Sequence, residues 1–422
     1  MNVFAAAVVT TETSAVFLAL AIVITVSQLF GAALQRLGQP RVMGEILGGI
    51  ALGPSLLGWI APEVEEQLFG GGITDDLTFL GQLGLAIFMY LVGLELKPSM
   101  LRGQASLALR ISLSGIVVPM AMGIALAYGL DSWEPTLFPG PRTLDGALFM
   151  GTAMAITAFP VLAYILKDRA LLEQPLGNLS IACAAVDDLL SWIILAGVVA
   201  FSRSGSMLTA LIPLGLTLSW AFVLLVLMRP LTLKLQQHFE RNQELSPLVQ
   251  GMLFAGLLIS SVVTEQIGVH VIFGAFLWGL AMPRHEALHQ RLETKLETVV
   301  MRLLLPMFFV TSGLETELTR LGNVNLLLIT ALVVAVAVAG KYFGTWTSAR
   351  LGGVNHRDAQ ALAWLANTRG MTELVVLNVG VRIGAINATM FGIGVVMAVA
   401  TTLMTGPMLN RLGYGKEQPA PV

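Results

Sequence analysis

The stretch "LANTRGMTELVVLNVG" (residues 365–380) interrupts a long apolar run with polar residues and a glycine. Asn367, Thr368, Arg369 and Gly370 stand where a membrane-spanning helix would be continuous and apolar. Irregular backbone at membrane depth persists only where protein buries it or where it lines a water-filled cavity. The stretch therefore predicts a broken helix beside a functional cavity.

A second run, "AMAITAFPVLAYIL" (153–166), carries a break of its own. Pro160 removes a backbone donor and clashes with the preceding turn, which frees carbonyl groups around Ile156 and Thr157. The two breaks fall at a similar depth in their runs. We therefore expect two broken helices to meet near the middle of the membrane.

The composition indicates an integral membrane protein. Of the 422 residues, 55% are hydrophobic and 12% are charged, which is too apolar for one water-soluble globule. The net charge of -2 offers no electropositive surface for nucleic acid. The single cysteine, Cys183, excludes an internal disulfide. Nothing in the sequence indicates a cofactor.

Apolar runs long enough to cross a membrane recur along the whole chain. A helix needs about 20 apolar residues to cross a bilayer core of about 30 Å. The runs predict an all-α polytopic membrane protein with about thirteen transmembrane helices, of which the ninth is the shortest. The expected spans are residues 13–35, 42–60, 77–96, 106–129, 146–166, 177–201, 207–228, 246–264, 268–282, 299–314, 324–349, 359–381 and 386–410.

Basic residues gather in alternate connections between these spans. With the N-terminus outside, seventeen Lys and Arg residues lie in the inner connections, and only Arg142, Arg203, Arg320 and Arg382 lie in the outer ones. This asymmetry predicts an outer N-terminus and a cytoplasmic C-terminus. The seventeen are Arg36, Arg41, Lys97, Arg102, Lys167, Arg169, Arg229, Lys234, Arg241, Arg284, Arg291, Lys295, Arg302, Arg350, Arg357, Arg411 and Lys416.

Asp187 and Asp188 are neighbours in an otherwise apolar run, at a depth close to that of Lys341. At 1.5 Å per residue, both sites lie about 14 to 17 Å from the nearest membrane boundary. Lys341 cannot snorkel that far, so it needs an internal partner. Because successive helical residues point about 100° apart, one aspartate can pair with Lys341 while the other faces a cavity. The second aspartate can then bind either a proton or a hard monovalent cation.

Four further charged residues inside the spans have local explanations. Arg369 and Glu373 are spaced i to i+4 and can form a structural pair within one helix. Glu45 lies near the end of its span and is expected to face the membrane interface. Arg110 lies about one or two turns inside its helix and is expected to snorkel.

The two broken runs are seven spans apart, so they cross the membrane in opposite directions. This arrangement is typical of inverted repeats, whose broken helices meet at the midplane and bind ions. Here spans four to six would repeat as spans eleven to thirteen. The sequence thus predicts inverted repeats with two crossed broken helices.

Seven motifs follow one another along nearly the whole chain: "QPRVMGEILGGIALGPSLLG" (39–58), "LGLAIFMYLVGLELKPSM" (83–100), "TAFPVLAYILKD" (157–168), "VDDLLSW" (186–192), "LPMFFVTSGLE" (305–315), "GKYFG" (340–344) and "NTRGMTELVVLNVG" (367–380). In order and spacing they resemble the motifs of the monovalent cation:proton antiporter superfamily. The chain is most similar to the double-aspartate branch, which includes NapA-type bacterial sodium/proton antiporters and the membrane domains of plant cation/proton exchangers. Tyr164 and Thr372 depart from the pattern, which has a basic and an apolar residue there.

The resemblance implies a homodimeric antiporter of the bacterial inner membrane that exchanges Na+ or K+ for H+ by alternating access. On that template Asp188 matches the carrier of cation and proton, and Asp187 matches the partner of Lys341. Thr157 and the neighbouring carbonyl group of Ile156 match auxiliary cation ligands. Two carboxylates favour two protons per cation, which would make the exchange electrogenic.

The template also assigns supporting residues and domains. Asn367, Arg369, Glu373 and Pro160 belong to the polar and irregular surroundings of the two breaks. Residues 1–422 are expected to form a single transmembrane unit without a soluble regulatory domain. Its moving core would span about 77–201 and 299–410, and its dimerisation scaffold about 13–60 and 207–282.

Other functions remain open from the sequence. "HEALH" (285–289) fits the H-E-x-x-H zinc pattern of metalloproteases, but it opens a segment of alternating charge and has no evident third ligand. Related broken-helix folds can also couple sodium to the symport of an organic anion. A third alternative is a scaffold that does not transport and has an enzymatic or sensory role.

Overall fold

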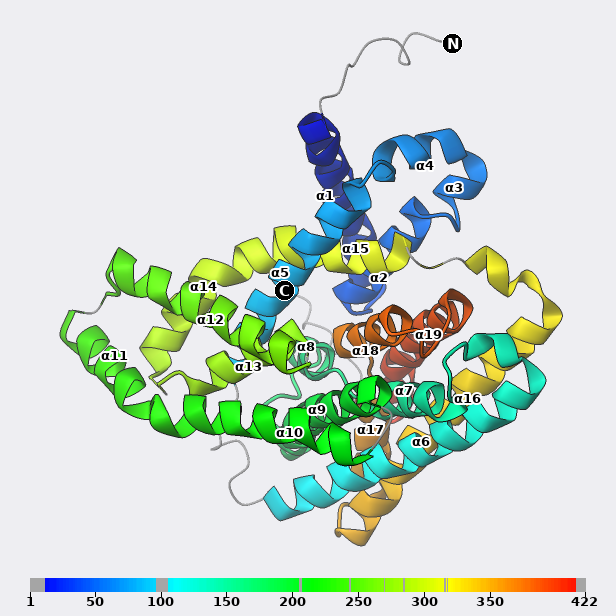
Figure 1. The fold of residues 1–422 in the computed structure, drawn as a ribbon. Coiled ribbons are helices and arrows are strands. Elements are labelled where there is room, and N and C mark those ends of the chain that lie inside the picture. The colour runs from blue at the N-terminus through cyan, green and yellow to red at the C-terminus, as the bar shows by residue number, and fades with distance from the viewer. Residues whose placement is uncertain are drawn as a thin grey trace, which may run out of the picture.

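The computed structural model describes residues 12–95, 105–204, 207–242, 244–268, 270–283, 285–314, 316 and 318–414. Every regular element in these ranges is a helix (Figure 1), which confirms the all-α prediction. Four of the predicted cytoplasmic bases, Lys97, Arg102, Arg284 and Lys416, lie outside the described residues.

One group of helices gathers around α15 (Leu305–Leu314), and we call it the α15 group. It comprises α1 (Glu12–Arg36), α2 (Arg41–Leu52), α3 (Leu57–Ile60), α4 (Pro62–Phe69), α5 (Ile73–Glu95), α10 (Met207–Phe222), α11 (Arg229–Asn242), α12 (Pro247–Ile267), α13 (Val271–Ala281) and α14 (Glu286–Val299). The π-helical turns η3 (Val223–Leu227) and η4 (Val300–Leu304) extend α10 and α14. α15 packs on α1, α2 and α5, and α13 packs on α5 and α12. α10 packs mainly on α9 (Pro175–Ser204) of the second group and follows it in the chain.

Glycines let α2 and α15 touch backbone to backbone. A Cβ atom at Gly49 would lie 2.7 Å from the Cα of Val310. A Cβ atom at Gly313 would lie 2.5 Å from the carbonyl carbon of Gly49. Small residues at such crossings allow close helix packing within a membrane.

A second group surrounds α6 (Ala105–Trp133), and we call it the α6 group. It comprises the 3₁₀ turns η2 (Pro135–Leu137) and η5 (Leu318–Gly322), together with α7 (Thr143–Ala155), α8 (Phe159–Asp168), α9 (Pro175–Ser204), α16 (Val324–Leu351), α17 (His356–Ala366), α18 (Met371–Arg382) and α19 (Ala388–Arg411). α6 packs on α7, α9 and α16, and α16 packs on α17 and α19.

Hydrogen bonds between connections define two faces of the α6 group. On the face that carries the end of α19, which we call the C-terminal face, Arg169 Nη1 donates to Asn410 Oδ1 at 2.6 Å. On the opposite face, Asn387 N donates to the carbonyl group of Leu137 at 3.1 Å. The helices from α6 to α9 are thus hydrogen-bonded to the segment around α19 at both faces.

Both predicted helix breaks are present. Ile156 and Ala158 have extended backbone between α7 and α8, with φ, ψ of -76°, 141° and -82°, 100°. Pro160 lies in the first turn of α8, where a helix needs no backbone donor from it. Residues 367–370 separate α17 from α18.

The number of membrane crossings stays a prediction. In the described residues, nine helices are long and apolar enough to cross a membrane, or ten if Gly215–Leu227 and Arg229–Arg241, bent by 42°, form one span. The two broken helices and the eleven-residue α13 are not among them. Thirteen crossings therefore require that these three segments cross and that the bent pair forms one span.

Candidate ion-binding site

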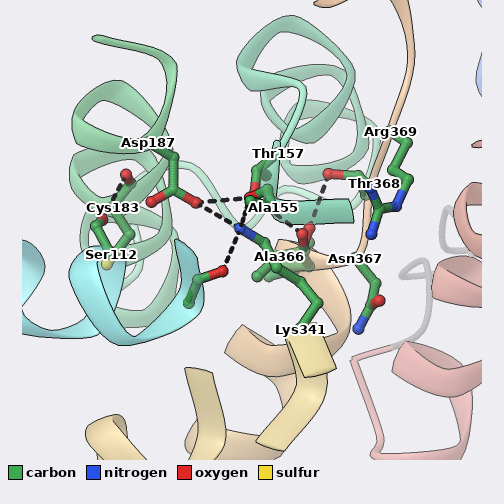
Figure 2. A network of polar contacts seen from close by, with 12 residues as sticks. Ser112, Ala155, Thr157, Cys183, Asp187, Lys341, Ala366, Asn367, Thr368 and Arg369 are labelled. Carbon is green, nitrogen blue, oxygen red and sulfur yellow. Dashed lines mark hydrogen bonds and ion pairs between the residues drawn. The ribbon is translucent and has the colours of Figure 1, made fainter. Parts of the chain in front are cut away.

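The two breaks cross in contact with each other inside the α6 group. Ala158 N, in the first break, donates to the carbonyl group of Thr368, in the second, at 2.9 Å. Thr157 Oγ1 lies within hydrogen-bond distance of the carbonyl oxygen of Ala366, at 3.0 Å (Figure 2). Segments about 200 residues apart in sequence thus form one polar centre, as the fold prediction requires.

Positively charged side chains meet the carbonyl groups at the end of α7. Arg369 donates through Nη1 to Ala153 O and through Nη2 to Met154 O, the latter at 2.7 Å. Lys341 Nζ donates to Ala155 O at 2.6 Å. The last carbonyl groups of a helix carry partial negative charge and lack partners within the helix, so these cations stabilise the break.

Neutral side chains meet the carbonyl groups at the end of α17. Besides Thr157, the donors are Asn367 to Ala363 O at 3.1 Å, Thr368 to Leu365 O at 2.7 Å and Thr405 to Trp364 O at 3.1 Å. Around the second break, Thr402 Oγ1 also accepts from Arg369 N and donates to Arg369 O. The carbonyl groups at the end of α17 therefore have hydrogen-bond donors that carry no charge.

Lys341 and Asp187 form a buried ion pair. Lys341 Nζ lies 3.1 Å from Asp187 Oδ2 and also donates to Gly115 O at 2.9 Å, so with Ala155 O all three ammonium protons have acceptors. Asp187 Oδ2 accepts a second hydrogen bond from Thr157 Oγ1 at 2.8 Å (Figure 2). The Lys341 side chain is wholly inaccessible to solvent.

Asp188 has no fixed countercharge. Its side chain is buried, and Thr372 Oγ1 of α18 donates to its Oδ1 at 3.5 Å. No Lys or Arg in the described part of the chain forms an ion pair with it. The two neighbouring aspartates therefore differ in their surroundings, because only Asp187 pairs with Lys341.

Arg369 and Glu373 are brought together, although not as a purely local pair. Arg369 Nη1 lies 3.5 Å from Glu373 Oε2, and both side chains are fully buried. Neither oxygen of Glu373 accepts a hydrogen bond within the described residues. Arg369 precedes α18 and donates to α7, so it joins the two broken helices rather than one turn of one helix.

A cavity of about 450 Å³ opens between the two groups of helices. Ala158 and Tyr164 line it from the α6 group, and Glu45, Arg41 and Arg302 line it from the α15 group. Ala158 belongs to the first break, so the cavity reaches the crossing. The cavity therefore extends as far as the first break, at Ala158, while Asp187 and Asp188 are not among its lining residues.

The structure corrects the expectation that Glu45 faces the membrane interface. Its side chain is 4% exposed and accepts from Arg41 Nε at 3.1 Å. The pair lies on one helix, α2, and lines the cavity. Arg110, in contrast, is exposed near the start of α6 and donates to Ser106 O at 3.2 Å.

Two supporting residues have limited contacts. Ile156 lies buried at the end of α7, and its side chain offers no polar group. Asn367 uses its amide nitrogen on α17 and leaves Oδ1 without a partner within the described residues. The contacts that sequence reasoning missed are Gly115, Thr402 and Thr405, which carry no signal in their own apolar runs.

The histidines of "HEALH" do not form a metal site. His285 Nδ1 accepts from Leu288 N at 3.3 Å and begins α14. His289 Nε2 lies 2.7 Å from Pro283 O. Within the described residues, no group of three or more His, Cys, Asp or Glu side chains is arranged to hold a metal ion.

Sequence comparisons find similar proteins over almost the whole chain. A family model described as "Sodium/hydrogen exchanger, transmembrane" matches residues 10–413. The chain is 41% identical to the Na(+)/H(+) antiporter NhaS4 of Synechocystis sp., over 93% of this chain and 95% of that one. It is 36% identical to Cation/H(+) antiporter 20 of Arabidopsis thaliana and 30% identical to K(+)/H(+) antiporter 1 of Saccharomyces cerevisiae, over 92% and 93% of this chain. It spans about half the length of those two, 47% and 46%.

A solved structure has a similar fold. The sodium proton antiporter MjNhaP1 from Methanocaldococcus jannaschii superposes with a TM-score of 0.69, covering 96% of this chain and 98% of that one. The two sequences are 16% identical, so this comparison concerns the fold alone. It agrees with the predicted antiporter fold of crossed broken helices.

Proposed function

Because the chain belongs to the sodium/hydrogen exchanger family, we propose that it is a secondary antiporter that exchanges a monovalent cation, Na+ or K+, for H+. One observation carries the proposal. Asp188 is a buried carboxylate without an ion-pair partner among the described residues, beside the crossing of two broken helices. Such a group needs either a proton or a mobile cation, because an isolated buried charge is very costly.

The family consists of transporters, so an enzymatic role for this chain is excluded. Sodium-coupled symport of an organic anion fits the site poorly. An anionic substrate would need free cationic donors, whereas the three ammonium protons of Lys341 are all occupied and Arg369 is committed to α7. Antiport needs only the exchange of ligands at one carboxylate.

In the proposed cycle, Asp188 binds either the cation or a proton, but never both together. A bound cation would lie near the crossing, where Thr157 Oγ1 and the carbonyl group of Ile156 are available as further oxygen ligands. Oxygen atoms are the ligands that hard cations prefer. Competition for one carrier, together with alternating access, couples the two fluxes.

We propose that Asp187 supplies the second proton of an electrogenic exchange. Protonation of Asp187 would break its ion pair with Lys341, and the pair would re-form when a cation at Asp188 displaces both protons. An exchange rate insensitive to membrane potential would contradict the stoichiometry of two protons per cation.

The cavity of about 450 Å³ supports an inward-facing state, with the C-terminal face in the cytoplasm and the N-terminus outside. The same orientation follows from the distribution of Lys and Arg in the connections. We further propose a homodimer in the bacterial inner membrane.

We propose that the α6 group is the moving core and the α15 group the scaffold. This division places α5 and α15 in the scaffold, because both pack on helices of the α15 group. The sequence-based division placed their residues, from 77 and 299 onwards, in the core. Without α5 and α15, the proposed core consists of the helices of the predicted inverted repeat, α6 to α9 and α16 to α19.

The test is proton flux in liposomes that contain the purified protein and a pH-sensitive dye. Addition of Na+, K+, Li+ or Rb+ in turn identifies the transported ions. We expect Asp188→Asn to reduce cation-dependent proton flux to the level of empty liposomes. Asp75→Asn, an exposed aspartate at the start of α5, is the matched control and should retain flux. Flux that survives in Asp188→Asn would overturn the proposal.

A further inference from the structure

Polar side chains join the two groups of helices on the face opposite the open cavity. Arg382, at the end of α18, faces Gln82 of α5. With the amide of Gln82 oriented so that its oxygen faces the guanidinium, this oxygen accepts from Nη1 and Nη2 at 2.9 and 2.5 Å. One turn earlier on α18, Asn378 Nδ2 donates to Ser312 Oγ of α15 at 3.3 Å.

Little space remains between these contacts. The cavity that they line, together with His270 and Phe308, measures about 20 Å³. That is room for about one water molecule. On the other side of the crossing, the cavity that reaches Ala158 measures about 450 Å³. The passage between the two groups is therefore open towards one face and closed towards the other.

The closing residues are connected directly to the ion site. α18 begins at the second break and carries Thr372, the contact of Asp188, in its first turn. Arg382 lies ten residues further along the same helix, about 15 Å away at 1.5 Å per residue. A helix of this length moves as a rigid body, so a displacement at the crossing displaces Asn378 and Arg382 as well.

We propose that Arg382 and Asn378 of α18, with Gln82 and Ser312 as their partners, form the gate that closes the site from the face opposite the C-terminus. The inference rests on the proposed exchange, which requires that face to open in turn. The two hydrogen bonds from the charged guanidinium of Arg382 to the amide oxygen of Gln82 favour the closed state. The guanidinium also carries a positive charge at the closed mouth and repels cations there until α18 moves away.

The first experiment bridges the gate. Ser312→Cys and Asn378→Cys are combined in a Cys183→Ser background, whose own exchange serves as the reference. A short bifunctional thiol reagent should abolish exchange in the double variant, and a reductant should restore it. Each single variant should be unaffected by the reagent. Exchange that continues after bridging, with the bridge verified by mass spectrometry, would overturn the proposal.

The second experiment measures access without transport. Val375→Cys places a thiol on the wall of the small cavity, and a membrane-impermeant maleimide is applied from the face opposite the C-terminus. Adding Arg382→Gln should raise the labelling rate at least several-fold. The matched control is Arg142→Gln, which removes an arginine that pairs with Asp145 outside the gate.

Equal labelling rates with and without Arg382→Gln would contradict a closing role for Arg382. This readout needs no ion flux, so its outcome is independent of the Asp188→Asn test. A faster labelling rate together with flux that survives in Asp188→Asn would retain the gate and reject the proposed carrier. Equal labelling rates together with loss of flux in Asp188→Asn would reject the gate and retain the carrier.

Discussion

The two helix breaks are alike in topology and different in electrostatics. At the end of α7, the carbonyl groups of Ala153, Met154 and Ala155 accept from the fixed cations Arg369 and Lys341. At the end of α17, the corresponding carbonyl groups accept from neutral threonine and asparagine side chains. Each helix end carries roughly half a negative charge. Among the described residues, charged side chains compensate that partial charge at α7 and not at α17.

The difference explains how one site can hold a mobile cation without collapsing when it leaves. The α7 end stays compensated in every state, because its cations belong to the chain. The α17 end and Asp188 keep uncompensated negative potential, which a cation or a proton can satisfy in turn. Loss of a fixed cation should therefore affect stability most, and loss of a neutral donor should affect it least.

Lys341→Gln should have the largest effect. It leaves Asp187 buried without its countercharge, and removal of one partner from a buried ion pair costs about 3 to 5 kcal/mol. We expect a strong drop in melting temperature in detergent and loss of exchange. Fluorescence-detected gel filtration after heating measures the first, and the liposome assay measures the second.

The matched control for Lys341→Gln is the double variant with Asp187→Asn. It removes both charges together, so it should regain most of the lost stability. Equal melting temperatures for the single and double variants would show that the charge of Asp187 is not what Lys341 compensates. The α7 end would then depend on the carbonyl contacts of Lys341 alone.

Both breaks could be predicted from sequence because proline, glycine and charged residues are conspicuous in an apolar run. The donors to the α7 carbonyl groups could not. The i to i+4 spacing of Arg369 and Glu373 suggests a pair within one helix, yet Arg369 donates to Ala153, 216 residues away. Such contacts depend on tertiary packing, which spacing along a single helix does not encode.

Two other features left partial signals in the sequence. Thr372 is polar where the related pattern has an apolar residue, and its hydroxyl group donates to Asp188. Arg382 was counted as one of four bases in outer connections, which predicts its face but not its contact with Gln82. A count of charges locates a residue along the membrane normal and says nothing of its neighbour in the plane.

Thr157→Val should have an intermediate effect, because Thr157 belongs to the first break and contacts the end of α17 at the second. Its hydroxyl group has a single proton, yet acceptors lie at 2.8 Å (Asp187 Oδ2) and 3.0 Å (Ala366 O). A hydrogen bond to a charged group contributes about 1.5 to 3 kcal/mol. We expect the cation concentration for half-maximal exchange to rise about tenfold, which corresponds to about 1.4 kcal/mol.

Thr157→Ser keeps the hydroxyl group and should stay within about twofold of the unaltered protein, since a twofold change is well below 1 kcal/mol. The cation concentration for half-maximal exchange is measured for all three proteins by titration with Na+ and with K+. Equal values for the valine and serine variants would remove the hydroxyl group from the site. Thr157 would then not couple the end of α17 to Asp187 through its hydroxyl group.

Thr405→Val should have the smallest effect. The hydroxyl group of Thr405 donates to Trp364 O at 3.1 Å, a neutral contact behind the α17 end. A neutral hydrogen bond contributes about 0.5 to 1.5 kcal/mol, so the melting temperature should fall slightly. The cation concentration for half-maximal exchange should not change, because Thr405 contacts neither aspartate. If that concentration rose as much as in Thr157→Val, the carbonyl groups of α17 would bind the cation directly. The break without fixed cations would then be the cation-binding site itself.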